Sequence, residues 1–173
     1  QKWTVLIYMN GDNSLSAATD ADLEELERID TLRGQASSDV SFVIQRDERF
    51  SGARRYIASY LPNPGMEMQE IEGLGEVNMA DPQTLADFLA WGKSVRPADH
   101  YALIVWDHGT GFRTRAVTRS AALKNISWDE TDGNDSLTVD EVHTVLQQQG
   151  GVDLLCFDAC LMANTEVAHQ LKD

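Results

Sequence analysis

The chain has 173 residues, of which 42% are hydrophobic and 24% are charged, and its formal net charge at pH 7 is -14. This length fits one domain with a sizeable core and is short for two. The negative charge argues against nucleic acid as a partner, because phosphates would be repelled, and no window approaches the run of about twenty apolar residues that a membrane span needs. The chain begins with Gln1 rather than Met, which is compatible with removal of a leader or pro-segment.

Apolar runs alternate with amphipathic segments along the chain. In chain order, we expect a strand at 3–9, a helix over 15–29, a strand at 40–45, an edge hairpin from 55–60 and 66–71, a helix that starts at Asp81-Pro82, a strand at 102–106, a helix behind the capping box Thr138–Glu141, a strand at 152–157 and a last helix capped by Asn164. This alternation predicts an α/β fold with a mostly parallel central sheet and helices on both faces.

Two of the predicted strands are followed by reactive side chains. The strand at 102–106 leads to His108, and the strand at 152–157 leads to Cys160. Because the carboxyl ends of neighbouring parallel strands open onto one crevice, we expect the two side chains to lie together there. A thiol beside an imidazole is the minimal nucleophile and base for acyl transfer. The sequence therefore indicates a cysteine peptidase.

Between these strands, the segment 112–125 is rich in basic residues and has no clear periodicity. Its cations are Arg113, Arg115, Arg119 and Lys124. Such a cluster is usually a solvated surface loop. It would also be an exposed site for cleavage by a protease that prefers basic residues.

The segments around these residues carry a family resemblance. Trp3–Met9, Gly75–Met79, Ile104–Gly109 and Phe157–Met162 resemble, in this order, the core segments of the clostripain family of caspase-like cysteine peptidases. The resemblance spans essentially the whole chain. It implies a single caspase-like peptidase domain over 1–173, a three-layer sandwich that is incomplete at its C-terminus, because such a domain should have further strands after Asp173.

The resemblance also implies roles for single residues. Cys160 would be the nucleophile, His108 the general base, and the backbone amides of Gly109 and Cys160 the oxyanion hole. Family members cleave after Arg or Lys, and Asp158, two residues before the cysteine, would bind that side chain. A carboxylate suits this task, since it forms a charge-assisted pair with a guanidinium.

Further expectations concern the whole precursor. Many members of the family are zymogens that cut themselves between the histidine and the cysteine, where segment 112–125 lies; Lys124 and Arg119 are the preferred positions here, ahead of Arg115 and Arg113. The remaining C-terminal part of the same precursor would be a partner, together with peptides or proteins that have Arg or Lys before the cut. The resemblance implies a secreted or cell-envelope bacterial protein.

Other residues have simpler interpretations. We expect Cys156 to be an inert core side chain, since cysteine is among the most buried residue types, and Asp107 to be structural. His100, His143 and His169 are expected to serve packing or to lie at the surface.

No metal or cofactor is required by the predicted chemistry. The acidic stretch 129–135 offers oxygen ligands but does not match the twelve-residue calcium loop, so a solvated turn is expected there, and calcium stays open without assigned ligands.

Two other functions remain open. One is a catalytically inactive caspase-like module used for binding. The other is a phosphate- or nucleotide-binding domain with Gly109-Thr110-Gly111 as the phosphate turn, although the chain lacks a full glycine-rich fingerprint and a lysine-containing phosphate loop.

Overall fold

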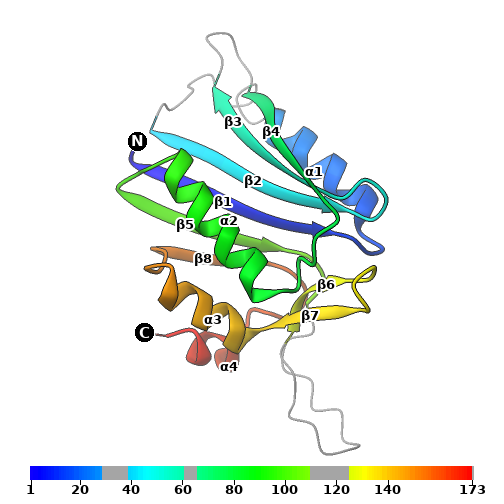
Figure 1. The fold of residues 1–173 in the computed structure, drawn as a ribbon. Helices are drawn as coiled ribbons and strands as arrows, with labels where there is room; N and C mark the ends of the chain where they lie inside the picture. The colour runs from blue at the N-terminus through cyan, green and yellow to red at the C-terminus, as the bar shows by residue number, and fades with distance from the viewer. Residues whose placement is uncertain (29–38, 61–65, 110–124, 173) are drawn as a thin grey trace, which may run out of the picture.

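The computed structural model describes residues 1–28, 39–60, 66–109 and 125–172. Its elements are β1 (Trp3–Gly11), α1 (Ser16–Arg28), β2 (Val40–Glu48), β3 (Ala53–Tyr60), β4 (Met66–Gly75), α2 (Pro82–Val95), β5 (His100–Trp106), β6 (Asn125–Asp129), β7 (Asp135–Thr138), α3 (Val139–Gln148), β8 (Leu154–Asp158) and α4 (Thr165–Gln170). Figure 1 shows these elements as one central sheet with helices before and behind it and a small hairpin at one end.

The central sheet has six strands in the order β4-β3-β2-β1-β5-β8. β1 pairs in parallel with β2 and β5, and β5 pairs in parallel with β8. Only β3 runs against its neighbours, so β3 and β4 form the predicted edge hairpin. The predicted mostly parallel α/β sheet is confirmed.

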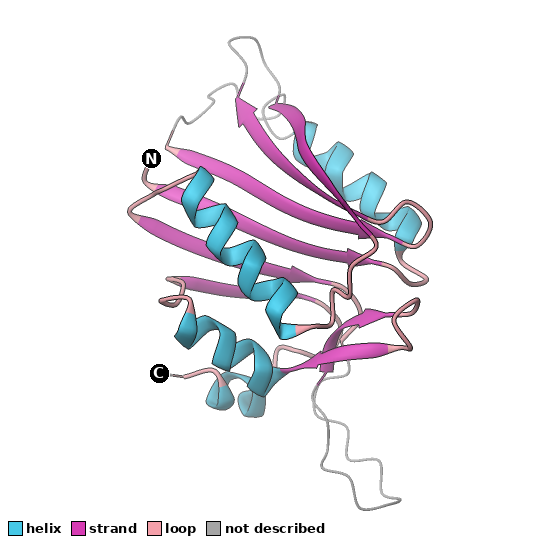
Figure 2. Ribbon diagram, in the orientation of Figure 1, coloured by secondary structure: helices cyan, strands magenta, loops and turns pink. Residues whose placement is uncertain are grey.

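Helices cover both faces of this sheet, as Figure 2 shows. On one face Leu6 and Tyr8 of β1 pack in a core that includes Phe88 of α2 and residues of α3. On the other face Ile7 and Met9 pack in a second core with Leu26 of α1. A strand that supplies both cores needs apolar residues at successive positions, which is why β1 reads as a continuous hydrophobic run.

Three helix starts follow the expected capping chemistry. Asp81 accepts a hydrogen bond from the Gln83 amide ahead of α2, and Asn164 accepts one from the Val167 amide ahead of α4. Thr138 and Glu141 form both bonds of the capping box at α3. Each cap satisfies amides that a helix start leaves without partners.

The hairpin of β6 and β7 is a difference from the prediction, which placed irregular chain up to Asn125 and a solvated turn over 129–135. The two strands have only five and four residues, and Ser127, with a φ of 61°, interrupts the pairing of β6, so the buried positions of this strand do not alternate regularly. The turn itself is exposed, but Asp129 is fully buried.

Cys156 is exposed, so the prediction of a buried core position is wrong. Its strand, β8, is the last in the sheet order, and α1 packs against β1, β2 and β4 rather than over β8. Alternate residues of β8 therefore face outward: Leu154 is 56% exposed, and Cys156 and Asp158 follow on the same side.

In the part of the chain that the structure describes, no helix has the length and apolar character required to cross a membrane.

Candidate active site

The ends of β5 and β8 place His108 and Cys160 at neighbouring positions of one sheet edge. Trp106 of β5 is paired with Asp158 of β8, and the Asp107 amide donates to the Asp158 carbonyl over 3.3 Å. His108 and Cys160 each follow two residues after that register pair. The structure therefore brings together the two chain segments in which the sequence predicts the nucleophile and the base.

Gly109 lies directly against the backbone of Cys160. A Cβ atom at position 109 would be 2.5 Å from the Cys160 carbonyl oxygen, 2.8 Å from Met162 Cγ and 3.0 Å from Ala159 Cβ. Only a residue without a side chain fits such an approach. Gly109 also bridges to Ile126, which ties this site to the β6–β7 hairpin.

The imidazole of His108 has a hydrogen-bond partner from the turn after β1. Ser14 Oγ lies 2.9 Å from His108 Nε2. Ser14 belongs to the turn between β1 and α1, and its side chain is exposed at the same edge of the sheet. The contact restrains the ring orientation, as a third group does for the base in acyl-transfer sites.

Asp107 anchors the turn that carries Ser14. Its buried carboxylate accepts hydrogen bonds from Asn13 Nδ2, over 2.7 Å, and from the Trp128 amide. Asn13 Nδ2 also reaches the Trp128 carbonyl, over 2.9 Å. Burial raises the pKa of Asp107 to about 7, although the backbone amides of His108 and Trp128 lower it in part. Asp107 is structural, as predicted, and it joins the ends of β1, β5 and β6.

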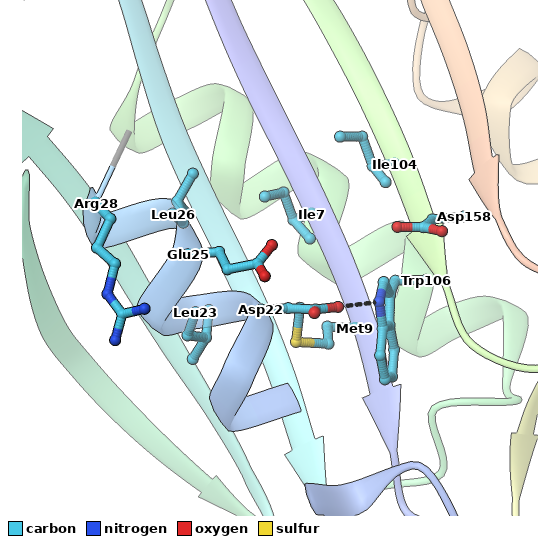
Figure 3. A pocket seen from close by; sticks show the side chains of 10 residues that line it. All are labelled: Ile7, Met9, Asp22, Leu23, Glu25, Leu26, Arg28, Ile104, Trp106 and Asp158. Atoms are coloured by element: carbon cyan, nitrogen blue, oxygen red, sulfur yellow. Dashed lines mark hydrogen bonds between the residues drawn. The ribbon is translucent and has the colours of Figure 1, made fainter. Parts of the chain in front are cut away.

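Asp158 borders a cavity of about 580 Å³ on the α1 side of the sheet. Figure 3 shows this cavity between α1 and the ends of β5 and β8. Its lining is Ile7, Met9, Asp22, Leu23, Glu25, Leu26, Arg28, Ile104, Trp106 and Asp158. Asp22 accepts a hydrogen bond from Trp106 Nε1 over 2.6 Å, which holds the indole between the helix and Asp158. The lining thus combines an apolar floor with three carboxylates and one guanidinium, that of Arg28.

Both cysteines are free thiols and both are exposed. Cys156 lies on the outward side of β8, and Cys160 lies past the strand end beside Gly109. Of the other histidines, His100 pairs with Asp153 over 3.0 Å and stacks on Trp3, and His169 is exposed on α4. Neither is at the site.

Ser14 and Asn13 are the residues that the sequence did not reveal. Asn10, Asp12 and Asn13 read only as turn residues, because nothing local shows that the turn folds back onto the end of β5. The candidate processing residues Arg113, Arg115, Arg119 and Lys124 lie outside the described residues.

A thiol near an imidazole at adjacent ends of parallel strands is an arrangement that suits nucleophilic Cys–His hydrolases. The chain belongs to the clostripain family of cysteine peptidases, because the model of that family matches residues 7–173. Clostripain of Hathewaya histolytica is 30% identical over 194 residues, which cover 99% of this chain and 36% of clostripain.

Solved structures share the fold. A secreted C11 cysteine protease from Bacteroides thetaiotaomicron, bound to an irreversible peptide inhibitor, has a TM-score of 0.77 at 24% identity, covering 99% of this chain and 46% of its own. An inactive zymogen C11 protease from Parabacteroides distasonis has a TM-score of 0.76 at 23% identity, covering 98% of this chain and 45% of its own. The chain therefore spans less than half of the length of these relatives.

Proposed function

We propose that this protein is the part of a cysteine endopeptidase that contains its catalytic dyad, and that the enzyme cleaves peptide bonds after Arg or Lys. The proposal rests above all on the pairing of β5 with β8, whose ends lead to His108 and to Cys160, and on the close approach of Gly109 to the Cys160 backbone. Membership of the clostripain family supports the same chemistry.

The reaction divides into two acyl transfers. His108 takes the thiol proton of Cys160, and the sulfur attacks the scissile carbonyl, while the amides of Gly109 and Cys160 stabilise the oxyanion. His108 then gives the proton to the leaving amine, which leaves a thioester on Cys160. Water, deprotonated by His108, attacks the thioester, and the acid product leaves as the thiol is restored. Ser14 keeps the imidazole oriented through its bond to Nε2.

Asp158 is the proposed determinant of specificity. The cavity at its side has an apolar floor for the aliphatic stem of Arg or Lys, and Asp158, Asp22 and Glu25 supply negative charge. Long basic side chains favour such surroundings, because the stem packs on apolar surface while the cation pairs.

The C-terminal remainder of the precursor is the proposed partner of β8. Leu154 of this strand is 56% exposed, and Leu161 beyond it is 59% exposed. The relatives are about twice as long or longer, so they have further chain with which such a strand can pair. A pocket wall from that remainder would complete the cavity beside Asp158.

We also propose that the protein is made as a zymogen which cuts itself after Lys124 or Arg119, or after Arg115 or Arg113, and that it acts outside the cytoplasm, in the medium or the cell envelope. The descriptions of one relative as an inactive zymogen and of another as secreted support these two points.

One panel of variants, made in the full-length precursor, tests the proposal, with peptidyl amides that end in Arg, Lys or Leu as substrates and with N-terminal sequencing of each purified protein. Cys160→Ala should abolish turnover and self-cleavage, whereas Cys156→Ala should keep both, because Cys156 lies on the outward side of β8. Asp158→Asn keeps the shape and removes the charge, so the loss should fall on the Arg and Lys substrates.

Normal turnover by Cys160→Ala would exclude the assigned nucleophile. Full activity in an uncut wild-type chain would exclude the hypothesis that the protein is made as an inactive zymogen. A wild type that is inert toward all three substrates and toward a thiol-reactive arginyl probe would favour the alternative function, an inactive module used for binding.

A further inference from the structure

The residue after Cys160 has an unusual backbone conformation. Leu161 has a φ of 62°, in the left-handed region that residues other than glycine rarely adopt. Among the described residues, the other non-glycine residues with a positive φ are Ser127 and Asn134. Asparagine tolerates this region because its short polar side chain can hydrogen-bond locally. For a bulky leucine the conformation is strained, so it persists only where the surrounding structure imposes it.

The leucine side chain does not impose this conformation. Leu161 is 59% exposed, so packing of its side chain offsets little of the strain. The residues on either side of it are held in place instead. The Cys160 carbonyl oxygen lies against Gly109, where an added Cβ would be 2.5 Å away. Met162 is buried in the core that includes residues of α3 and α4.

The N–Cα bond of Leu161 joins these two fixed neighbours. Its rotation sets the direction of the planar peptide group between Cys160 and Leu161, relative to the chain that continues into Met162. A change to the usual negative φ would turn the Cys160 carbonyl away from Gly109 or would pull Met162 out of the core. The positive φ is therefore what allows both contacts at once.

Asn164 ties the strained residue to the start of α4. Its Nδ2 donates to the Leu161 carbonyl over 2.8 Å, and its Oδ1 accepts from the Val167 amide over 2.9 Å. Its own amide donates to the Met162 carbonyl over 2.9 Å. Because Val167 is buried, the helix start that carries these bonds is anchored in the core. One side chain thus caps a helix and holds the carbonyl of the residue after Cys160.

We propose that Leu161 is a positioning residue for Cys160, and that its left-handed backbone, held by Asn164, fixes the orientation of the Cys160 amide and thiol. The inference rests on the proposed function, in which Cys160 supplies both the nucleophile and one donor of the oxyanion hole. Both groups must be aimed correctly at one carbonyl, so a small displacement of this residue would slow the reaction. What matters at position 161 is the backbone conformation and not the side chain.

The test sets conformational preference against side-chain character at position 161 of the full-length enzyme. Leu161→Asn loses the apolar side chain but tolerates a positive φ, whereas Leu161→Val stays apolar and disfavours that φ because it is β-branched. We expect kcat for an arginyl amide to stay within about threefold in Leu161→Asn and to fall at least about tenfold in Leu161→Val, with KM nearly unchanged.

Leu154→Val is the matched control for this pair. Leu154 is a leucine of similar exposure, 56%, on the strand that leads to Cys160, and it is not among the residues with a positive φ. The same substitution there meets no conformational conflict. It should leave kcat within about twofold of wild type.

Asn164→Ser tests the bond that holds the strained residue. Serine caps helices about as well as asparagine, but its side chain is shorter, so it cannot cap α4 and also reach the Leu161 carbonyl. We expect kcat to fall about 3–10-fold. In a Leu161→Gly background the same change should cost less than about twofold, since glycine adopts this φ without strain.

Alkylation of Cys160 by iodoacetamide, located by mass spectrometry, separates this inference from the proposed function because it needs no peptidase activity. A displaced thiol loses its imidazole neighbour and reacts more slowly near neutral pH. The rate should fall in Leu161→Val and stay near wild type in Leu161→Asn and Leu154→Val. A wild type that hydrolyses no peptide would refute the proposed function, while alkylation rates in this order would still support the positioning of Cys160.

Three results would overturn the inference. One is a larger loss of kcat and alkylation rate in Leu161→Asn than in Leu161→Val, which would assign the effect to the side chain. Another is wild-type behaviour of both variants. The third is an equal cost of Asn164→Ser with leucine and with glycine at position 161, which would leave Asn164 as a helix cap alone.

Discussion

His108 is held by a side chain from a different strand end. Ser14 reaches its Nε2 from the turn after β1, and that turn is fixed in place by the bond from Asn13 to Asp107, the residue before the histidine. The proposed base is thus restrained both through its ring and through the residue before it. Positioning of this kind matters because proton transfer requires the correct orientation as well as the correct residue.

Removing the Ser14 hydroxyl should weaken this restraint. A neutral hydrogen bond contributes about 0.5–1.5 kcal/mol, so Ser14→Ala should lower kcat about 3–10-fold with little change in KM. The pH profile of kcat should also move, because the bond to the ring changes, and Ser14→Thr should restore most of the rate. Ser16→Ala, at the first residue of α1, serves as the control. Equal kinetics in Ser14→Ala and wild type would show that the contact does not act on the base.

The pairing of β8 with β5 sets the geometry of the whole site. A shift by one residue would turn Asp158 to the opposite face and separate Gly109 from Cys160. Gly109 fits only because its Cα hydrogen faces the Cys160 carbonyl. The active-site edge therefore tolerates little change in backbone position.

Gly109→Ala tests this tolerance. The added Cβ would be 2.5 Å from a backbone oxygen that cannot rotate away, so the two strand ends must separate. We expect kcat/KM to fall by about 100-fold or more, since a displacement of about 1 Å can have that effect, while the thermal midpoint falls by only a few degrees. Gly73→Ala is the control, because a Cβ there meets nothing within 4 Å. An active Gly109→Ala protein would contradict the close approach.

The elements that could be predicted from sequence are those with strong local signals. β1 and β5 are long apolar runs, and the capping box of α3 is complete at Thr138 and Glu141, so each is recognisable on its own. The β6–β7 hairpin, by contrast, depends on contacts between distant residues, such as Asn10 with Ser127. The exposure of Cys156 depends on whether a helix covers its side of β8, and the local sequence does not indicate this. The candidate dyad could be predicted from the sequence because its two residues follow recognisable strands. Ser14 could not be predicted, because its contact with His108 joins residues far apart in the chain.

At the scale of the whole molecule, some of the carboxyl groups counted in the formal net charge of -14 are buried. Burial raises the pKa of Asp47 to about 8 and that of Asp107 to about 7, from a usual value of 3.8. For both groups the folded state holds the proton more tightly than the unfolded state does. Their contribution to stability is fully present below the unfolded pKa and is lost as the pH rises through 7 and 8.

We therefore expect the thermal midpoint of Cys160→Ala protein in EDTA to fall between about pH 6 and about pH 8.5. Asp47→Asn should flatten this slope and raise the midpoint at the higher pH by at least about 2 °C, since 1 kcal/mol corresponds to about 2–4 °C in a domain of this size. The variant keeps an acceptor for the Glu48 amide and loses only the charge. Scanning calorimetry at both pH values is the measurement. A midpoint that rises with pH, or an unchanged slope in the variant, would contradict the assignment.

The ladder between β5 and β8 has a consequence for a chain that has been cut. Every basic residue of 112–125 lies after β5 and before β6, so cleavage at any of them leaves β5 and β8 on separate polypeptides. Those two pieces would still share a sheet, a core and the contacts of Asn10 and Asn13 with Trp128. The cut protein would run as one particle in a sizing column and as two bands on a denaturing gel. Once unfolded, it would have to find its other half again by diffusion, so its recovery would depend on concentration where that of the intact chain would not.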